Sequence, residues 1–398
     1  MLLIAAPGQG AQTPGFLTPW LELPGFGDRL AAWSEPAGCD LLRCGTSADA
    51  EEIRDTAVAQ PLLVASAIAA VDQVVTGAHL VSRQSVGVAG HSVGELAAGV
   101  MAEVITAEDA MGLVRVRAQG MAAAAAAEPT GMTAVLGGDE ATVLAAIEAY
   151  GLTPANVNGA GQIVAAGTLA QLAAFGENPP AGARLRPLSV AGAFHTHHMA
   201  PAVEALTAAA EDVQVRDPVR PLLSNRDGAV VRSGKDWMDR IINQVSAPVR
   251  WDQCMQTMES LGVTAMIELP PAGTLTGLAK RALRGVQLVA LKTPDDLAAA
   301  HALLAEHAES HADSHAPEWR LLVAPLAGVF RAPVGHPDSA EPGTPVGEGA
   351  ELGYVEMRGG SHAVAPDFPA TVIEWLVEDG DPVSAGQPLV RLQPQLAD

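Results

Sequence analysis

Ser92 stands in the stretch AGHSVGELAAG (Ala89 to Gly99), between Gly90 and Gly94, directly after a run of small apolar residues. A G-x-S-x-G pattern that follows a buried strand and opens a helix projects a serine hydroxyl from the carboxyl edge of a sheet. The first turn of that helix would offer free N–H groups and a positive dipole end to an oxyanion. We therefore predict that Ser92 is a nucleophile; the alternative is an ordinary serine at a strand–helix junction.

A nucleophilic serine needs a general base, and one short stretch offers candidates. GAFHTHHM holds three histidines, His195, His197 and His198, close to the end of a predicted strand. A single histidine is more often structural or exposed than catalytic, so we expect two of the three to take no part in the chemistry. The third would accept the serine proton.

The elements around these residues alternate between apolar runs of strand length and longer helical patterns. This alternation predicts an α/β fold with a mostly parallel sheet. The predicted strands are Leu2–Pro7, Ser85–Ser92, Val263–Pro270 and Val286–Lys292, and the predicted helices include Pro61–Val75, Val93–Glu103, Ala107–Ala127 and Ala200–Glu211.

Residues 128–192 have a different pattern from the rest of the first 305 residues. Their strand and helix signals follow the order β-α-β-β-α-β, which is that of the ferredoxin-like unit. We predict a small subdomain inserted into a main α/β core made of residues 1–127 and 193–305. A cleft between subdomain and core would bind a ligand.

Residues 306–319 read as a polar helix end and a linker. His307, His311 and His315 are four residues apart, so on a helix they would share a face and would be placed to hold a metal. No cysteine lies near them and Pro317 ends any helix. We therefore expect a solvated linker, and no metal site.

The composition limits the classes of partner. The net charge is −22, with 48% hydrophobic and 17% charged residues, and such a field repels nucleic acid. The first residues lack the basic segment of a signal peptide, and we see no uninterrupted apolar run of the roughly 20 residues that a membrane helix needs. Cysteine occurs only as Cys39, Cys44 and Cys254, which suits a reducing compartment. We expect a cytoplasmic protein with no nucleic-acid or membrane partner and no cofactor.

Seven motifs in a fixed order resemble one enzyme family. They are APGQGAQ, GHSVGE, VRVRAQGM, NVNGAGQIVAAG, GAFHTHHM, NQVSAPVRW and IELPPAGTLTGLAKRAL. Over about the first 300 residues, their order and spacing are similar to those of the malonyl-CoA:acyl-carrier-protein transacylase family. The resemblance implies an α/β-hydrolase-like acyltransferase core. It also implies transfer of malonyl from malonyl-CoA to the phosphopantetheine thiol of acyl carrier protein, by a ping-pong cycle for fatty acid synthesis.

The resemblance also implies roles for individual residues. Ser92 matches the acylated nucleophile and His195 the general base and acid, whose second ring nitrogen is held by a backbone carbonyl. Gln9 and Val93 match the two backbone N–H donors of the oxyanion hole. Gln244 matches a glutamine that orders the serine–histidine pair.

Further matches concern the substrate. Asn158 and His91 match residues of the cleft, and Arg117 matches an arginine at its floor, whereas Arg115 is expected to be exposed. A guanidinium there would grip a free carboxylate through two parallel hydrogen bonds, which malonyl offers and acetyl does not. Phe194 would fill the space of a methyl branch, so we expect malonyl rather than methylmalonyl to be transferred.

Five basic residues form a cluster that would receive the acidic carrier protein; ordinary solvated surface is an equal alternative. The cluster consists of Lys280, Arg281, Arg284, Arg184 and Arg186.

Other functions stay open. One is malonyl transfer for polyketide synthesis or malonate metabolism. Another is a serine esterase, which rests on the G-x-S-x-G pattern alone, and a non-enzymatic binding protein is a third class.

Residues 320–398 are rich in Pro and Gly with short strand-like runs, which predicts a small all-β domain. Their sequence resembles a biotinyl/lipoyl carrier domain. The expected turn reads EMRGG (Glu356–Gly360), and no lysine follows Lys292. Because biotin and lipoate are attached through a lysine amide, we expect a degenerate carrier domain that serves in docking, dimerisation or stabilisation.

Overall fold

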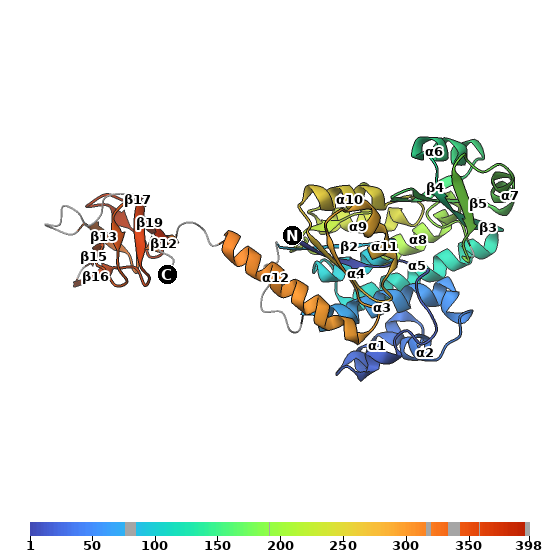
Figure 1. Cartoon of the computed structure of the whole chain (residues 1–398). Coiled ribbons are helices and arrows are strands. Elements are labelled where there is room, and N and C mark those ends of the chain that lie inside the picture. Colours follow the sequence, from blue (N-terminus) through green and yellow to red (C-terminus); the bar gives the residue numbers. More distant parts are fainter. Residues whose placement is uncertain (76–84, 191, 316–319, 333–342, 358, 395–398) are drawn as a thin grey trace. The chain divides into compact units, whose positions relative to one another are not determined.

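The computed structural model describes residues 1–75, 85–190, 192–315, 320–332, 343–357 and 359–394 (Figure 1). The chain divides into two compact units, Met1–Glu309 and Ser310–Asp398, and each is described by itself. The first unit holds a six-stranded and a five-stranded sheet, and the second unit holds two four-stranded sheets.

The six-stranded sheet has the order β11-β10-β1-β2-β7-β8. Neighbouring strands are parallel except at the β7–β8 edge. All four strands predicted from the apolar runs are present, each shorter than its run. The strands are β1 (Leu2–Ala6), β2 (Val86–Gly90), β7 (Leu222–Leu223), β8 (Val230–Val231), β10 (Ala265–Glu268) and β11 (Gln287–Ala290).

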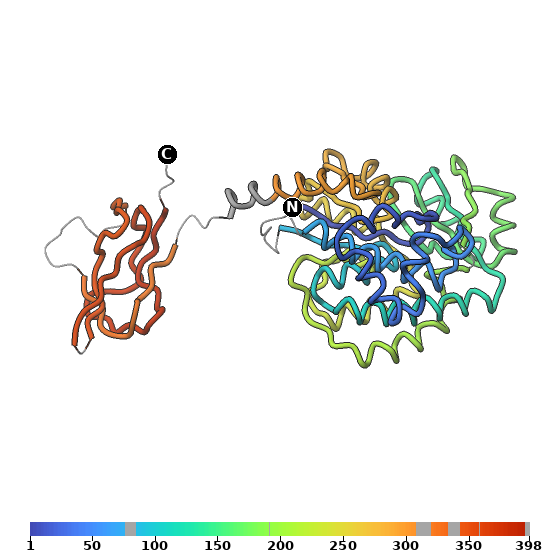
Figure 2. The backbone as a smooth tube through the Cα atoms, turned by 90° about the horizontal axis from the view of Figure 1, so that it is seen from below, coloured from blue at the N-terminus to red at the C-terminus, as the bar shows by residue number. Residues whose placement is uncertain are grey.

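Helices cover both faces of this sheet (Figures 1 and 2). The side chains of β1 alternate between two cores because successive residues of a strand point to opposite faces. Leu2 and Ile4 belong to the core that also contains α3, α4 and α5, whereas Leu3 and Ala5 pack with α10 and α11. A strand buried on both faces needs a continuous apolar run, which is what the sequence has there.

The helices agree with the prediction except near their ends. The predicted helix Ala107–Ala127 is α5 with the same bounds, and Thr106 begins it with a capping box to Asp109. The helices of the first unit, outside the five-stranded sheet, are α1 (Phe26–Ala37), α2 (Leu41–Thr46), α3 (Thr56–Val75), α4 (Gly94–Met101), α5 (Ala107–Ala127), α8 (Ala200–Ala210), α9 (Gly234–Gln244), α10 (Trp251–Ser260), α11 (Thr274–Ala282) and α12 (Leu297–His315), with 3-10 turns η1 (Thr18–Glu22), η2 (Glu52–Arg54), η3 (His197–Met199) and η4 (Pro294–Asp296).

Helix α3 is longer than the sequence predicted. It begins at Thr56, five residues before the predicted start, and it is long and apolar enough by composition to cross a membrane. In the structure 78% of its most apolar window is buried inside the protein. Burial on nearly all sides explains the continuous apolar composition, because a helix in the centre of a large core needs no polar face.

The five-stranded sheet has the order β6-β3-β5-β4-β9. Its first four strands and their two helices follow the predicted order along the chain, and β9, from outside residues 128–192, adds a parallel edge to β4. The elements are β3 (Thr130–Gly137), α6 (Glu140–Ala149), β4 (Thr153–Gly159), β5 (Gln162–Thr168), α7 (Leu169–Glu177), β6 (Ala183–Pro187) and β9 (Val249–Arg250).

Helix α12 occupies much of the stretch expected to be a linker. It runs without a break to His315. His307 is buried, with its Nε2 2.8 Å from Thr264 Oγ1 and its Nδ1 2.9 Å from the Leu303 carbonyl oxygen. Thr264 also bonds the Met1 carbonyl, which places α12 beside the N-terminus (Figure 2). His307 therefore fixes the helix to the sheet, and no cluster of three metal-ligand side chains occurs among the described residues.

The second unit is entirely β-structure after α12. Its sheets have the orders β12-β19-β17-β14 and β16-β15-β13-β18, and one of its two apolar clusters contains residues of both sheets. In the β15–β16 hairpin Met357 pairs with Gly360, so these two residues of EMRGG close the hairpin, and Arg358 lies outside the described residues. The strands are β12 (Arg320–Val323), β13 (Gly328–Arg331), β14 (Pro345–Val346), β15 (Gly353–Met357), β16 (Gly360–Val364), β17 (Ala370–Trp375), β18 (Pro382–Val383) and β19 (Pro388–Pro394).

Replacing Gly94 tests how closely β1 and α4 approach. A Cβ at Gly94 would overlap the carbonyl oxygens of Ala6 and Pro7, which are backbone atoms and cannot turn away. We expect Gly94→Ala to lower the free energy of unfolding by about 1–3 kcal/mol, the usual range for overpacking. Urea titration would measure this change.

Gly112→Ala is the matched control. Gly112 lies within α5 and a Cβ there would meet nothing within 4 Å. This variant should gain about 1 kcal/mol from the higher helix propensity of alanine. Equal effects of the two substitutions would contradict the close approach at Gly94.

Candidate active site

Ser92 lies in the tight turn between β2 and α4, as the motif predicts. A Cβ at Gly90 would overlap the backbone of Gly94, so both glycines are required by the close packing of strand and helix. Ser92 has a φ of 53°, in the left-handed region that costs a serine energy. Asn225 holds the turn: its Oδ1 accepts from the Ser92 N–H at 2.7 Å, and its Nδ2 donates to the Gly90 carbonyl at 2.8 Å.

His195 is the histidine of GAFHTHHM that meets Ser92. The distance from Ser92 Oγ to His195 Nε2 is 2.7 Å, and Nδ1 lies 2.8 Å from the Gln244 carbonyl oxygen. A carbonyl oxygen can only accept, so Nδ1 carries the proton in the neutral ring and Nε2 presents its lone pair to the serine. Burial, with the positive charge of Arg117 beside it, lowers the pKa of His195 to about 3. The ring is therefore neutral at neutral pH and free to accept a proton.

The other two histidines stand apart from the serine. His197 is exposed, and His198 Nδ1 lies 2.8 Å from Glu128 Oε2. Of the three histidines, His195 is therefore the one whose ring is placed to accept the serine proton.

Arg117 lies on α5 with 1% of its surface exposed, while Arg115 on the same helix is exposed. Its Nη1 donates to Gln60 Oε1 at 2.6 Å and its Nη2 to Gln244 Oε1 at 2.8 Å. Nη2 is also 3.5 Å from Ser92 Oγ. Burial lowers the pKa of Arg117 to about 10, with Glu95 opposing the shift. The guanidinium is thus charged at neutral pH, next to the serine, and bonded to neutral oxygens.

Glu95 is a buried carboxyl in the first turn of α4, one amide away from Arg117. Its Oε1 accepts from the Asn225 N–H at 2.9 Å, and its Oε2 accepts from Nε2 of Gln244. Burial raises the pKa of Glu95 to about 8, against the effect of these two donors. Glu95 thereby connects the residue that holds the serine turn with the residue that holds His195 and Arg117.

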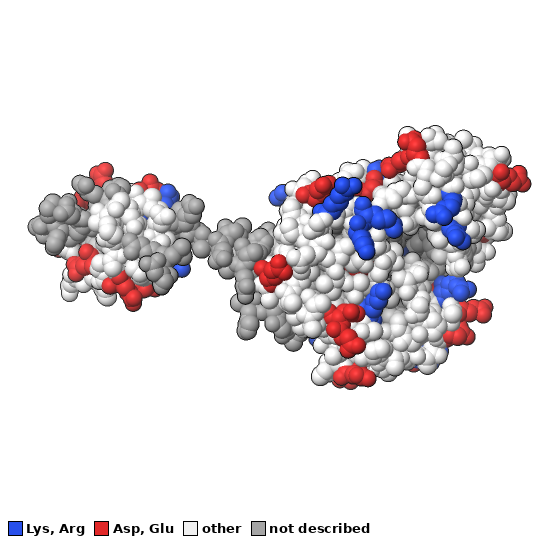
Figure 3. Space-filling view, viewed as in Figure 1, with Lys and Arg blue, Asp and Glu red and all other residues white. Residues whose placement is uncertain are grey.

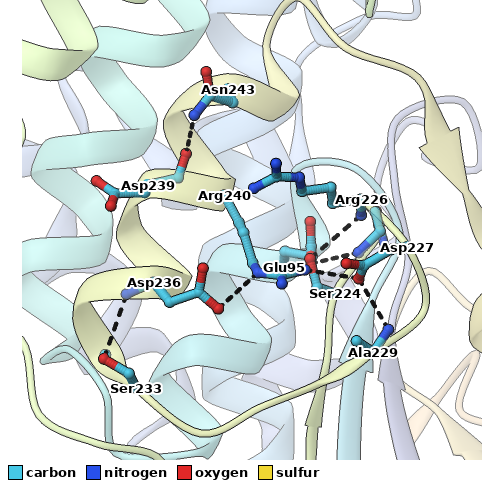
Figure 4. Close-up of polar contacts among 12 residues, drawn as sticks. Glu95, Ser224, Arg226, Asp227, Ala229, Ser233, Asp236, Asp239, Arg240 and Asn243 are labelled. Atoms are coloured by element: carbon cyan, nitrogen blue, oxygen red, sulfur yellow. Dashed lines mark hydrogen bonds and ion pairs between the residues drawn. The ribbon is translucent and has the colours of Figure 1, made fainter.

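A salt bridge fixes the loop that carries Asn225 to the helix that carries Gln244 (Figure 4). Arg240 of α9 donates from Nη1 to Asp227 Oδ1 at 2.7 Å and from Nε to Asp236 Oδ2 at 2.9 Å. The loop after β7 and helix α9 therefore present Asn225 and Gln244 to Glu95 as one framework.

Two residues of the pocket have backbone N–H groups without an acceptor among the described residues. Gln9 and Val93 line one pocket together with Ser92 and His195. Neither backbone N–H donates to an acceptor among the described residues. The Gln9 side chain instead reaches the Arg54 carbonyl, with a distance of 3.3 Å from Nε2 to the oxygen. Both N–H groups are thus available to a substrate oxygen.

The pocket wall differs from expectation at one residue. His91 and Phe194 line the pocket as predicted, but the residue of β4 that lines it is Asn156, not Asn158. Asn158 Oδ1 lies 2.9 Å from His91 Nε2, and it holds that ring, which packs edge-on against Trp251. Asn156 therefore lines the pocket directly, and Asn158 acts on it through the His91 ring.

The predicted basic cluster is exposed throughout. Lys and Arg side chains gather on both sides of a hollow on the face shown in Figure 3. Arg281 is also 3.3 Å from Gln162 Oε1 of β5, through its Nη2. The exposed side chains are Lys280, Arg281, Arg284, Arg184 and Arg186.

Three residues of this site escaped the sequence prediction: Gln60, Glu95 and Asn225. Each has a signal in retrospect, because each is a polar residue in or directly after an apolar run: AVAQPLLVA, GELAAG and PLLSN. Buried polar groups need partners, so single polar residues in such runs indicate internal hydrogen bonds. Their partners lie far away in the chain and are visible only in the fold.

The chain matches the family model described as acyl transferase domain over residues 6–314. The malonyl CoA-acyl carrier protein transacylase of Mycobacterium tuberculosis (strain H37Rv) is 54% identical over 297 residues, which is 75% of this chain and 98% of that protein. The protein of the same name from Escherichia coli K12 is 33% identical over 306 residues, covering 74% and 96%.

Solved structures agree with the sequence matches. The crystal structure of MCAT from M. tuberculosis superposes with a TM-score of 0.71 at 53% identity, covering 75% of this chain and 99% of that one. PlMCAT, a malonyl-transacylase in complex with the type II PKS acyl-carrier protein AntF, has a TM-score of 0.70 at 28% identity, covering 76% and 99%. Through its first unit, the chain belongs to the malonyl CoA-acyl carrier protein transacylase family of acyl transferases.

Proposed function

We propose that this chain transfers a malonyl group from malonyl-CoA to the phosphopantetheine thiol of acyl carrier protein, for fatty acid synthesis. The observation that carries this proposal is the charged, buried Arg117, whose hydrogen-bond partners among the described residues are the neutral oxygens of Gln60, Gln244 and Ser92. A guanidinium in that position favours an acyl group that ends in a carboxylate.

The reaction would proceed in two halves. In the first, His195 Nε2 takes the Ser92 proton while Oγ forms a bond to the thioester carbon of malonyl-CoA. The C–S bond then breaks, the thiolate of coenzyme A takes the proton from His195, and a malonyl-serine ester remains. In the second half the carrier thiol gives its proton to His195, its sulfur attacks the ester, and Ser92 leaves and regains a proton.

The tetrahedral intermediates of both halves carry an oxyanion. The backbone N–H groups of Gln9 and Val93, which have no other acceptor among the described residues, are the proposed donors. His195 would become an imidazolium next to the Gln244 carbonyl, which accepts its Nδ1 proton. The imidazolium would form in a site that already lowers its pKa, so it would return its proton readily to the leaving group.

The acyl specificity follows from charge and size. A neutral acyl group would leave the Arg117 charge buried without an anionic partner, which disfavours acetyl and longer fatty acyl groups. Phe194 is buried in the pocket wall and would occupy the space of an α-methyl branch. We therefore propose malonyl over methylmalonyl.

The alternatives have less support. Polyketide synthesis is represented by PlMCAT at 28% identity, against 54% for the mycobacterial proteins. An esterase triad would place a carboxylate on the histidine, whereas His195 Nδ1 bonds a carbonyl oxygen. A binding protein without catalysis would not need a serine and a histidine 2.7 Å apart.

We assign the finer fold as an α/β-hydrolase-like core, residues 1–127 and 193–305, with a ferredoxin-like subdomain at 128–192. The sheet order β6-β3-β5-β4, which is 4-1-3-2 in chain order, supports the subdomain assignment. The two sheets of residues 320–398 support a degenerate biotinyl/lipoyl-like domain, with residues 306–319 between the units. The hairpin tip Met357–Gly360 is where a carrier domain would present its lysine.

We further propose that the protein acts in the cytoplasm, and that the five exposed basic residues receive an acidic carrier. Two observations support the docking of a carrier: the five side chains are exposed, and Figure 3 shows a hollow between groups of basic side chains.

Arg117→Ala tests the function together with the specificity. Incubation with malonyl-CoA should give a malonyl ester on Ser92, detected by mass spectrometry, and acetyl-CoA should label it poorly. In Arg117→Ala the malonyl labelling rate should fall by on the order of 100-fold, since losing a buried charged partner costs about 2–5 kcal/mol. The gap between malonyl and acetyl should narrow.

Arg115→Ala, on the same helix but exposed, is the control and should label like the wild type. Absence of any ester on wild-type Ser92 would refute the mechanism. Equal labelling of the wild type by both donors would refute the role of Arg117.

Glu95→Gln tests the buried framework. Glutamine has one acceptor oxygen where Glu95 offers two, so either the Asn225 N–H or the Gln244 amide would face a second donor. An unsatisfied buried donor costs about 1–3 kcal/mol. We expect slower Ser92 labelling by malonyl-CoA and acetyl-CoA alike, because the serine turn and His195 are both affected.

Glu148→Gln, an exposed change of the same kind on α6, should leave labelling unchanged. A loss confined to malonyl in Glu95→Gln would show that Glu95 acts through Arg117 alone.

A chain ending at His315 tests the second unit. All site residues lie in the first unit, and the matched M. tuberculosis protein is covered to 98% of its length by 75% of this chain. We expect Ser92 labelling to stay within about twofold of the full chain, the scatter of neutral changes. Loss of labelling would contradict this. Unchanged stability, oligomeric state and transfer to carrier protein would refute the three roles suggested for the second unit.

A further inference from the structure

A groove opens from the catalytic pocket toward the surface. It shares Gln9, Leu188 and Val190 with the pocket that holds Ser92 and His195. The malonyl thioester and the carrier thiol must both reach Ser92 on a long arm, because much of the lining of the catalytic pocket is buried. The shared residues mark the groove as a route for that arm.

Three chain segments form the groove: residues 9–14 after β1, residues 50–54 before α3, and residues 187–190 after β6. Two side chains tie the first segment to the second. Gln12 Nε2 donates to the Ile53 carbonyl at 3.1 Å, and Gln9 Nε2 donates to the Arg54 carbonyl at 3.3 Å. The groove wall is thus connected directly to Gln9, a proposed oxyanion donor.

The groove lining combines apolar and uncharged polar groups with one cation. Ile53, Leu188 and Val190 supply apolar surface, Thr13 supplies a hydroxyl, and Arg54 is the one charged residue of the described lining. Arg54 is exposed, and its guanidinium has no partner among the described residues. Of the neighbouring acids, Glu52 is paired with Arg43, and Glu51 and Asp55 line a second pocket with Arg54 without an ion pair to it among the described contacts. In a protein of net charge −22, an unpaired arginine at a groove is a binding group for an anion.

We propose that this groove binds the 4′-phosphopantetheine arm of both substrates, with Arg54 on its phosphate; the proposal rests on the malonyl transfer proposed above. The arm has two amides and a dimethyl branch between its thiol and its phosphate, so it matches a mixed polar and apolar groove ending in a cation. It is also the chemical group common to coenzyme A and to the carrier protein. Arg54 therefore binds phosphate in each half of the ping-pong cycle.

Arg54→Gln tests the proposal with donors that differ only in the phosphate. Ser92 acylation is measured with malonyl-4′-phosphopantetheine and with malonyl-pantetheine, neither of which carries a nucleotide. The wild type should have a kcat/KM about tenfold higher for the phosphorylated donor, the size of one good charge-assisted contact. Arg54→Gln should lose this preference, mainly through KM, and should use malonyl-pantetheine as the wild type does.

Arg232→Gln is the charge-matched control. Arg232 is exposed, follows β8 and lines none of the described pockets, so its variant should keep the preference. Arg54→Lys should restore part of it, because lysine keeps the charge and loses the bidentate geometry.

Two further measurements separate the sources of the arm. Acylation by malonyl-CoA reports on the donor half, and transfer from isolated malonyl-enzyme to holo carrier protein reports on the acceptor half. A loss in Arg54→Gln is expected in both; a loss in one half only would contradict a shared groove. A wild type without preference for the phosphorylated donor, or equal losses on both small donors in Arg54→Gln, would overturn the phosphate role.

Failure of the proposed function gives a different result. If no malonyl thioester labels wild-type Ser92, malonyl transfer is refuted. The groove is then tested by titrating the wild type and Arg54→Gln with 4′-phosphopantetheine and with pantetheine in a calorimeter. Tighter binding of the phosphorylated form by the wild type alone supports the groove, and equal binding of both forms overturns it.

Discussion

Gln244, the last residue of α9, connects every reactive group of the site. Its backbone carbonyl accepts the Nδ1 proton of His195, its side-chain oxygen accepts from Arg117, and its side-chain nitrogen donates to Glu95. A single residue thereby fixes the tautomer of the base and the position of the acyl-binding cation. Because the backbone carbonyl of Gln244 contacts the base and its side-chain oxygen contacts the cation, a shift of α9 would disturb both together.

Backbone strain at the site depends on the same framework. Ser92 and His195 both have positive φ values, 53° and 61°. Such conformations persist only where surrounding contacts hold them. Asn225 holds the serine turn from both sides, and the Gln244 carbonyl holds the histidine ring. Glu95 bonds both Asn225 and Gln244. A carboxyl group that touches no reacting atom therefore supports the two residues with strained backbones, Ser92 and His195.

The sequence predicted the parts of this arrangement that are local. The apolar runs predicted the buried strands β1 and β2. The glycines at positions 90 and 94 predicted the tight strand–turn–helix, because a side chain at either position would overlap backbone atoms. The resemblance to the family supplied His195 and Arg117, which lie 103 and 25 residues from Ser92.

The predictions that were wrong or incomplete concern contacts between distant segments. The family resemblance placed Asn158 in the cleft; in the structure Asn158 contacts His91, which lines the pocket, and Asn156 of the same strand lines the pocket itself. Residues 306–319 were expected to be a polar helix end and a solvated linker, whereas the helix continues to His315 and His307 bonds Thr264 across the fold. Glu95, Asn225 and Gln60 are recognisable only once their partners are known. No local pattern encodes such pairings.

The charges of the buried site explain why size alone would not select malonyl. Burial pushes Glu95 and Arg117 each toward its neutral form, yet Arg117, with a pKa of about 10, stays charged at neutral pH. The oxygens it bonds belong to two amides and to the Ser92 hydroxyl, and Glu95 is connected to it through Gln244. The guanidinium therefore gains more from a carboxylate in direct contact than from any neutral group of the same volume. The Arg117 guanidinium lies 3.5 Å from Ser92 Oγ. Binding of the carboxylate to it therefore holds the acyl group close to the oxygen that forms the ester bond.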